Sequence, residues 1–148
     1  PVGPGVKLEY LDAAIYYPPP NTAIPVRAGN GNQFLQMSSA NGPGTVITTL
    51  PFPTIIGETY RLSFYIMSRA LVDPGDASVT VTTPAGTTPL ITGGAAWQLV
   101  NIDFVAIAAS STVSFTDVDI IPATANSPFV GALIDQVVVR RRCLTFPP

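Results

Sequence analysis

Four aspartates are the residues in this chain best suited to acid–base chemistry. They form two close pairs, Asp73 with Asp76 and Asp117 with Asp119. Two carboxyl groups could serve a glycoside hydrolase as its acid and its base or nucleophile. However, Asp73 and Asp76 flank a Pro-Gly dipeptide, where a turn accounts for them. Asp117 and Asp119 share one face of a predicted strand, where arginines could pair with them. The acids therefore do not predict an enzyme.

Nucleophilic catalysis also lacks support in the sequence. The chain has no histidine, which removes the usual general base and the commonest metal ligand. The single cysteine, Cys143, cannot form an intrachain disulfide, and no activating base is evident for its thiol. We expect Cys143 to be a small buried apolar residue, with an interchain disulfide as the alternative.

The basic residues cluster in the closing stretch "VVVRRRCLTFPP", which contains Arg140, Arg141 and Arg142. The whole chain has 7 basic and 9 acidic residues, a net charge of −2, so no basic field surrounds these arginines. The sequence thus predicts no nucleic-acid partner. It predicts instead that the arginines pair with acids such as Asp117 and Asp119, in the same subunit or the next.

The composition is unusually poor in charge. Charged residues make up 11% of the 148 residues, against about 25% in an ordinary soluble domain, and the mean hydropathy is +0.38. Surfaces with little charge promote association. We therefore expect much of the surface to be covered by neighbouring copies or by glycan. No Asn-x-Ser/Thr sequon is present, so any glycan would be O-linked. No apolar run is long enough to span a membrane.

Short runs of Val, Ile, Thr, Tyr and Phe lie between frequent prolines and glycines, which is typical of strands. In "YRLSFYIMSR", side chains of Tyr60, Leu62, Phe64 and Ile66 alternate with more polar ones. The sequence predicts an all-β antiparallel sandwich, a jelly roll. We expect its strands near residues 6–12, 24–28, 33–38, 45–50, 59–69, 78–83, 97–106, 112–119 and 133–142.

The two ends differ in composition from the middle. Residues 1–22 are predicted to form a proline-rich arm or first strand, residues 23–140 the jelly-roll sandwich, and residues 141–148 a C-terminal docking tail. Because the chain begins at Pro1, we expect that a leader was removed or that the sequence is partial.

Four stretches carry a resemblance to a known group. They are "GETYRLSFYI" (57–66), Trp97 leading to "DFVA" (103–106), "STVSFTDV" (111–118) and "GALIDQVVV" (131–139). In this order they resemble the galactose-binding-like jelly rolls, which include carbohydrate-binding modules of extracellular proteins. The resemblance implies a jelly-roll fold and sugar binding. It also places Asp135 where a closing-strand acid helps to bind structural calcium. The opening "KLEYLDAA" departs from the pattern that supplies the other ligands, so we predict no cofactor and keep Asp135 as the one calcium candidate.

Three aromatic residues are the candidates for sugar binding, because aromatic rings stack on sugar C–H groups. Trp97 is implied by the resemblance, and Tyr16 and Tyr17 precede three prolines that could extend a flat surface. Packing against the other sheet or a neighbouring chain is the alternative, and we favour it for all three.

We therefore expect a non-enzymatic structural subunit of an extracellular or cell-surface fibre or surface layer. Its copies would polymerise, as in donor-strand pili, through extended termini. The predicted assembly residues are Tyr16, Tyr17, Pro18, Pro19, Arg140, Arg142, Leu144 and Phe146. A carbohydrate-binding module of a secreted or cell-surface protein is the alternative, with glycans as partners. A viral or phage structural protein is the second alternative.

Overall fold

The protein, described by a computed structural model over residues 9–12, 33–37, 46–68, 77–118 and 132–142, consists of strands and turns. These residues form twelve β-strands and include no helix. Every pairing between described strands is antiparallel. The all-β prediction is confirmed.

The first sheet has five strands in the order β1-β2-β12-β5-β9. Its strands are β1 (Glu9–Asp12), β2 (Gln33–Gln36), β5 (Thr59–Ser68), β9 (Gln98–Val105) and β12 (Ala132–Arg141). The long strand β5 pairs with β12 on one side and with β9 on the other. It therefore sets the register of the sheet's widest part.

The second sheet has the order β3-β11-β6-β7, and β8 also pairs with β6. Its strands are β3 (Val46–Thr48), β6 (Ser78–Thr83), β7 (Gly86–Thr87), β8 (Ile91–Thr92) and β11 (Ser114–Asp117). A separate ribbon joins β4 (Phe52–Pro53) to β10 (Ser110–Ser111). The chain crosses between the sheets after β2, β3, β5, β8, β9 and β11, and such repeated crossing is typical of a jelly roll.

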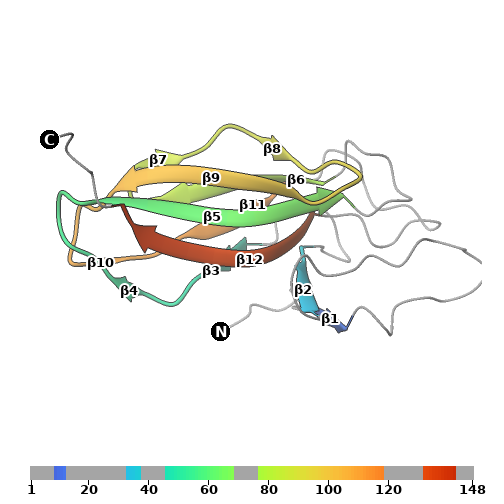
Figure 1. Cartoon of the computed structure of the whole chain (residues 1–148), viewed down its shortest axis with the longest axis horizontal. Coiled ribbons are helices and arrows are strands. Elements are labelled where there is room, and N and C mark those ends of the chain that lie inside the picture. Colours follow the sequence, from blue (N-terminus) through green and yellow to red (C-terminus); the bar gives the residue numbers. More distant parts are fainter. Residues whose placement is uncertain (1–8, 13–32, 38–45, 69–76, 119–131, 143–148) are drawn as a thin grey trace, which may run out of the picture.

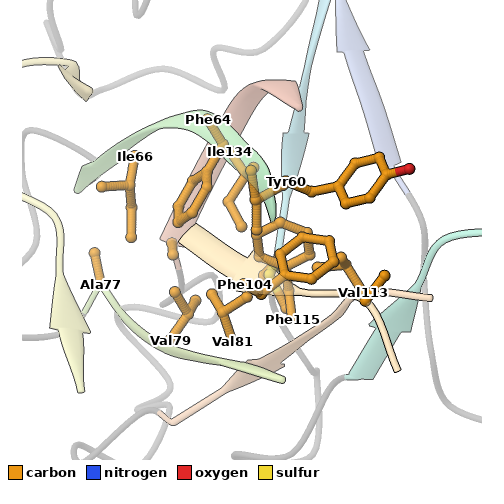
Figure 2. Close-up of a cluster of buried hydrophobic side chains, with 14 residues drawn as sticks. Tyr60, Phe64, Ile66, Ala77, Val79, Val81, Phe104, Val113, Phe115 and Ile134 are labelled. Carbon is orange, nitrogen blue, oxygen red and sulfur yellow. The ribbon is translucent and has the colours of Figure 1, made fainter. Parts of the chain in front are cut away.

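The core lies between the two sheets, which stack along their length (Figure 1). The rings of Phe64 and Phe115 meet edge to face across it, with centroids 5.1 Å apart. Figure 2 shows the buried cluster around this pair. The main cluster comprises Met37, Tyr60, Leu62, Phe64, Ile66, Ala77, Val79, Val81, Phe104, Ala106, Val113, Phe115, Ala132 and Ile134.

Strand β5 shows why the sequence folds this way. Its side chains alternate along the strand, because successive residues point to opposite faces of a sheet. The inward residues are Tyr60, Leu62, Phe64 and Ile66, all buried. The outward residues Arg61, Ser63 and Tyr65 are partly exposed. The predicted alternation is confirmed.

Strand β12 contains a β-bulge. Asp135 pairs with Tyr65 and Val138 pairs with Ser63, so two residues, Gln136 and Val137, stand opposite Phe64. Gln136 has a φ of 51°, a left-handed conformation that costs a residue with a side chain about 1–2 kcal/mol. Its backbone N–H donates to the Asp135 carboxylate at 2.7 Å, which helps to hold the bulge.

Eight of the nine predicted strands correspond to strands of the structure. The one near 6–12 overlaps β1, and the other seven coincide with β2, β3, β5, β6, β9, β11 and β12. The predicted strand at 24–28 lies outside the described residues. The structure adds four strands of two residues, β4, β7, β8 and β10, that the sequence did not indicate. The proposed divisions at residues 22 and 140 remain predictions.

Candidate functional site

The candidate site is the face of the first sheet that points away from the core, called here the outward face. Residues directly opposite each other on paired strands share one face. Across β12, β5 and β9 the pairing therefore defines three outward rows, which are Asp135–Tyr65–Leu99, Val138–Ser63–Asn101 and Arg140–Arg61–Asp103. Beyond the third row, Thr59 pairs with Val105, and the Arg142 N–H donates to the Thr59 carbonyl.

One end of the outward face is apolar and largely covered. Phe34, Met67 and Leu133 form a second buried cluster there, and Trp97 packs against it half-buried. The rings of Phe34 and Trp97 lie edge to face with centroids 6.1 Å apart. The alternation that buries Phe64 on one side of the sheet thus leaves Met67 to pack on the other.

The first two rows combine apolar and neutral polar groups with one partly buried acid, Asp135. Leu99 is exposed to 53%, and Tyr65 beside it is partly exposed. In the second row Ser63 donates its hydroxyl to the Asn101 side-chain oxygen at 2.7 Å, which leaves the Asn101 amide N–H groups facing solvent. This part of the sheet offers an apolar platform next to hydrogen-bonding groups.

The third row is built around Asp103. Arg61 donates to both carboxylate oxygens, from Nε at 2.7 Å and from Nη2 at 2.9 Å. Arg142 adds a third bond from Nη1 to Oδ2 at 2.6 Å. All three side chains are more than a third exposed. One carboxylate therefore holds two guanidinium groups in place on an open surface.

These hydrogen bonds shift the pKa values of Asp103 and Arg61. The hydrogen bond from Arg61, followed by that from Arg142, lowers the pKa of Asp103 from its ordinary value of 3.8 to about 2. The same hydrogen bond raises the pKa of Arg61. Asp103 and Arg61 therefore keep their charges throughout the pH range in which proteins are ordinarily handled.

We expect the Asp103→Asn variant to remove a pH-dependent part of the stability. Because the folded-state pKa of Asp103 is depressed, its stabilisation is present above about pH 4 and is lost as the pH falls toward 2. Screening limits the effect to less than about 1 kcal/mol. Denaturant unfolding of both proteins at neutral pH and at pH steps down to 2 would measure it.

The exposed Glu58→Gln variant is the control for loss of a negative charge. The difference between wild type and Asp103→Asn should shrink between pH 4 and pH 2. A difference that stays constant across that range would contradict the assigned cause.

The structure corrects the predicted partners of the arginines. Arg142 pairs with an acid, as predicted, but that acid is Asp103 and not Asp117. Asp117 lies on β11 in the second sheet, opposite Val79, and is only 1% exposed. Asp119 lies outside the described residues. Arg140 and Arg141 are exposed at the end of β12.

Several other predicted site residues cannot be placed. Those outside the described residues are Asp73, Asp76, Tyr16, Tyr17, Pro18, Pro19, Cys143, Leu144 and Phe146. The calcium candidate Asp135 is partly buried and accepts the hydrogen bond of the bulge. In the part of the chain that the structure describes, no three His, Cys, Asp or Glu residues gather as metal ligands.

The sequence did not single out Tyr65, Asn101 or Asp103 as site residues. The alternation of β5 placed Tyr65 on the outward face and was the one available signal. Asn101 and Asp103 join the face through the pairing of β9 with β5, which brings together residues about 40 positions apart. No local pattern encodes such a register.

A second exposed feature lies at the end of the sandwich that carries β4 and β10 (Figure 1). Three isoleucines there, Ile55, Ile56 and Ile107, are 53%, 66% and 70% exposed, and they are called here the isoleucine end. Gly57 and Ala106 bring their segments together, since the Gly57 N–H donates to the Ala106 carbonyl at 2.8 Å. Gly57 has a φ of 83°, which a glycine adopts without strain at this turn.

No helix within the described residues has the length and apolarity needed to cross a membrane. No protein-family model matches the sequence, and no curated protein matches it. Similarity is found among solved structures, as follows.

A structure from work on CBM4 structure and function shares 15% identity with this chain, with a TM-score of 0.53 over 74% of this chain and 70% of that one. A family 35 carbohydrate-binding module from an environmental isolate shares 18% identity, with a TM-score of 0.54 over 77% of each chain. The GH26-CBM35 β-(1,4)-mannanase of Podospora anserina shares 15% identity, with a TM-score of 0.54 over 94% of this chain but 28% of that chain. The fold of this protein is therefore the β-sandwich found in carbohydrate-binding modules.

Proposed function

We propose that this chain is a non-catalytic carbohydrate-binding module that holds a glycan on the outward face of its first sheet. The observation that carries the proposal is the grouping of Tyr65 and Leu99 with Ser63 and Asn101 in adjacent rows of an exposed sheet. The likeness in fold to carbohydrate-binding modules supports it.

The chemistry of these rows suits a sugar. A pyranose presents apolar C–H groups on its faces and hydroxyl groups at its edges. Tyr65 and Leu99 can pack against the C–H groups, as aromatic and aliphatic side chains do in ligand sites. The Asn101 amide and the Ser63 hydroxyl can exchange hydrogen bonds with sugar hydroxyls. An open sheet face offers these contacts to an extended glycan.

The sequence candidates fit this proposal in different ways. Trp97 lies beside the first row at the apolar end, so its exposed part can extend the platform. Contact by Tyr16 and Tyr17 stays a proposal from the sequence. Binding of polysaccharide would place the module in a secreted or cell-surface protein.

Calorimetric titration with mannohexaose, cellohexaose and xylohexaose tests the proposal. We expect at least one of these glycans to bind, and we expect Tyr65→Ala to weaken that binding at least about tenfold. Thr82→Ala is the matched control, because Thr82 is exposed on β6 of the second sheet. Equal binding by the two variants would show that the glycan does not use the outward face.

Self-association is the second candidate function, as a structural subunit of an extracellular fibre or surface layer. The isoleucine end favours it, because its exposed isoleucines lie on two segments that hydrogen-bond to each other and exposed apolar patches mark interaction surfaces. The small number of charged residues in the chain also favours self-association. We take the partner to be a second copy of this chain. Self-association is compatible with glycan binding, because one fold can carry both functions at different sites.

Sedimentation velocity over a wide range of protein concentration tests the second candidate. Wild type should form larger species as its concentration rises, whereas the double variant Ile56→Ser/Ile107→Ser should stay monomeric. Thr82→Ala again serves as the control surface change. A wild-type protein that remains monomeric at every concentration would remove the candidate.

A further inference from the structure

The end of the outward face that carries Arg61, Arg140 and Arg142 is called here the arginine end. Binding of a neutral glycan does not require these charged side chains. We propose that Arg61, Arg140 and Arg142 recognise an oxyanion, a carboxylate or a sulfate, on a glycan bound along this face. The inference rests on the proposed function and names the class of glycan. Four observations support it.

The first observation is a local excess of positive charge. Among the described residues, Arg61, Arg140 and Arg142 lie at one end of the outward face with one acid, Asp103, so this end carries a net charge of +2. The other acid of the outward face, Asp135, lies two rows away. The chain as a whole carries −2. A cationic group in an acid-leaning protein attracts an anionic ligand to one place rather than over the whole surface.

The second observation is that two guanidinium groups are already oriented. Asp103 takes two N–H groups of Arg61 and one of Arg142. Each guanidinium has five N–H groups, so both side chains keep donors for a second acceptor. Guanidinium donors match the oxygen geometry of carboxylate and sulfate groups. Because Asp103 has already fixed the side chains, less conformational entropy is lost when the ligand binds.

The third observation concerns Arg140, which stands in the same row as Arg61 and Asp103. Its side chain is exposed, and the side-chain ion pairs found among the described arginines belong to Arg61 and Arg142 instead. Its charge is therefore not neutralised by Asp103. Arg140 is the residue in this row most available to an incoming anion.

The fourth observation is continuity with the sugar platform. Tyr65 lies four residue steps beyond Arg61 along β5, which corresponds to about 13 Å of strand. A short oligosaccharide that packs on Tyr65 can therefore place an acidic substituent among the arginines. The one row between them, Val138–Ser63–Asn101, carries no charged side chain. This arrangement selects a glycan in which acidic groups accompany ordinary hydroxyls.

The test uses glycans matched except for charge. Calorimetry would compare oligogalacturonate with its fully methyl-esterified form, and sulfated with desulfated carrageenan oligosaccharides. We expect the anionic member of at least one pair to bind about tenfold more tightly than its neutral counterpart, with an affinity that falls as salt rises. Binding through a carboxylate should disappear as the pH falls below about 4, where the sugar carboxyl protonates. Binding through a sulfate should persist.

Two neighbouring arginines provide the variant and its control. Arg140→Gln should reduce the preference for the anionic glycan at least about threefold, since it removes a charge on the outward face. Arg141→Gln removes the same charge from the next residue, which pairs with Tyr60 on the core side, and should leave the preference unchanged.

Equal losses in the two variants would overturn the inference, because they would show a general charge effect. Equal binding of charged and neutral glycans would also overturn it while the proposed function stands. Absence of binding by every glycan, neutral and anionic, would overturn both.

Discussion

Replacing Phe64 with alanine should lower the free energy of unfolding by about 3–5 kcal/mol. Phe64 is fully buried on β5, between the two sheets, and its ring meets that of Phe115 edge to face (Figure 2). Truncation removes the transfer free energy of the ring and leaves a cavity that both sheets would have to close. Domains of this size are typically stable by about 5–15 kcal/mol, so the variant would lose a large share of its stability.

Urea unfolding followed by circular dichroism measures the loss. Leu50→Ala is the control, since Leu50 is 87% exposed and its truncation should change stability by less than about 0.5 kcal/mol. Similar unfolding midpoints for the two variants would show that Phe64 does not lie in the core.

The second large effect is expected at Gly93, in the segment after β8. A β-carbon built there would lie 2.7 Å from the Met67 carbonyl carbon and 2.9 Å from the Ser68 nitrogen, both backbone atoms. The Gly93 N–H also donates to the Ala77 carbonyl at 2.8 Å, which ties this segment in place. Because backbone cannot move aside as a side chain can, Gly93→Ala should cost about 1–3 kcal/mol or more.

The adjacent Gly94 offers a matched control. A β-carbon at Gly94 would meet the side-chain nitrogen of Gln98 at 2.9 Å, and this flexible side chain can rotate away. Gly94→Ala should therefore unfold at nearly the wild-type urea concentration, and Gly93→Ala well below it. Equal midpoints for the two alanine variants would mean that β5 and this segment do not approach so closely.

The central strands could be predicted from the sequence because their signal is local. The alternation in β5 is long and regular, so the buried positions of Leu62, Phe64 and Ile66 follow from period two alone. The valines of β6, Val79 and Val81, are likewise buried. The jelly roll then follows from many short strands separated by turn residues, together with the resemblance carried by four stretches.

The candidate site could be predicted only in part, because it depends on register. Asp103 lies on β9 and Arg142 directly follows β12; these two strands flank β5, and the two side chains meet across it. From the sequence, Asp117 was as good a partner as Asp103. The deciding fact is that β11 lies in the other sheet and directs Asp117 into the protein, whereas β9 directs Asp103 outward.

The shortest strands and the isoleucine end also escaped prediction. A strand of two residues, such as β4 or β10, has no period to detect and exists because its partner lies nearby. Likewise, Ile55 and Ile107 look like core residues in the sequence. Both are exposed in the segments that connect β4 to β5 and β9 to β10, at the end of the sandwich.

Because of its bulge, β12 has one residue more than regular pairing with β5 needs. A chain that lacked Gln136 could close the bulge into regular pairing, with Arg140 still opposite Arg61 and Val139 still opposite Leu62. The pairing of β5 with β9 shows no such irregularity. A deletion inside β5 would therefore exchange inward and outward side chains on one side of the cut. We therefore expect β12 to tolerate the loss of one residue at the bulge, opposite Phe64, and β5 to tolerate no such loss.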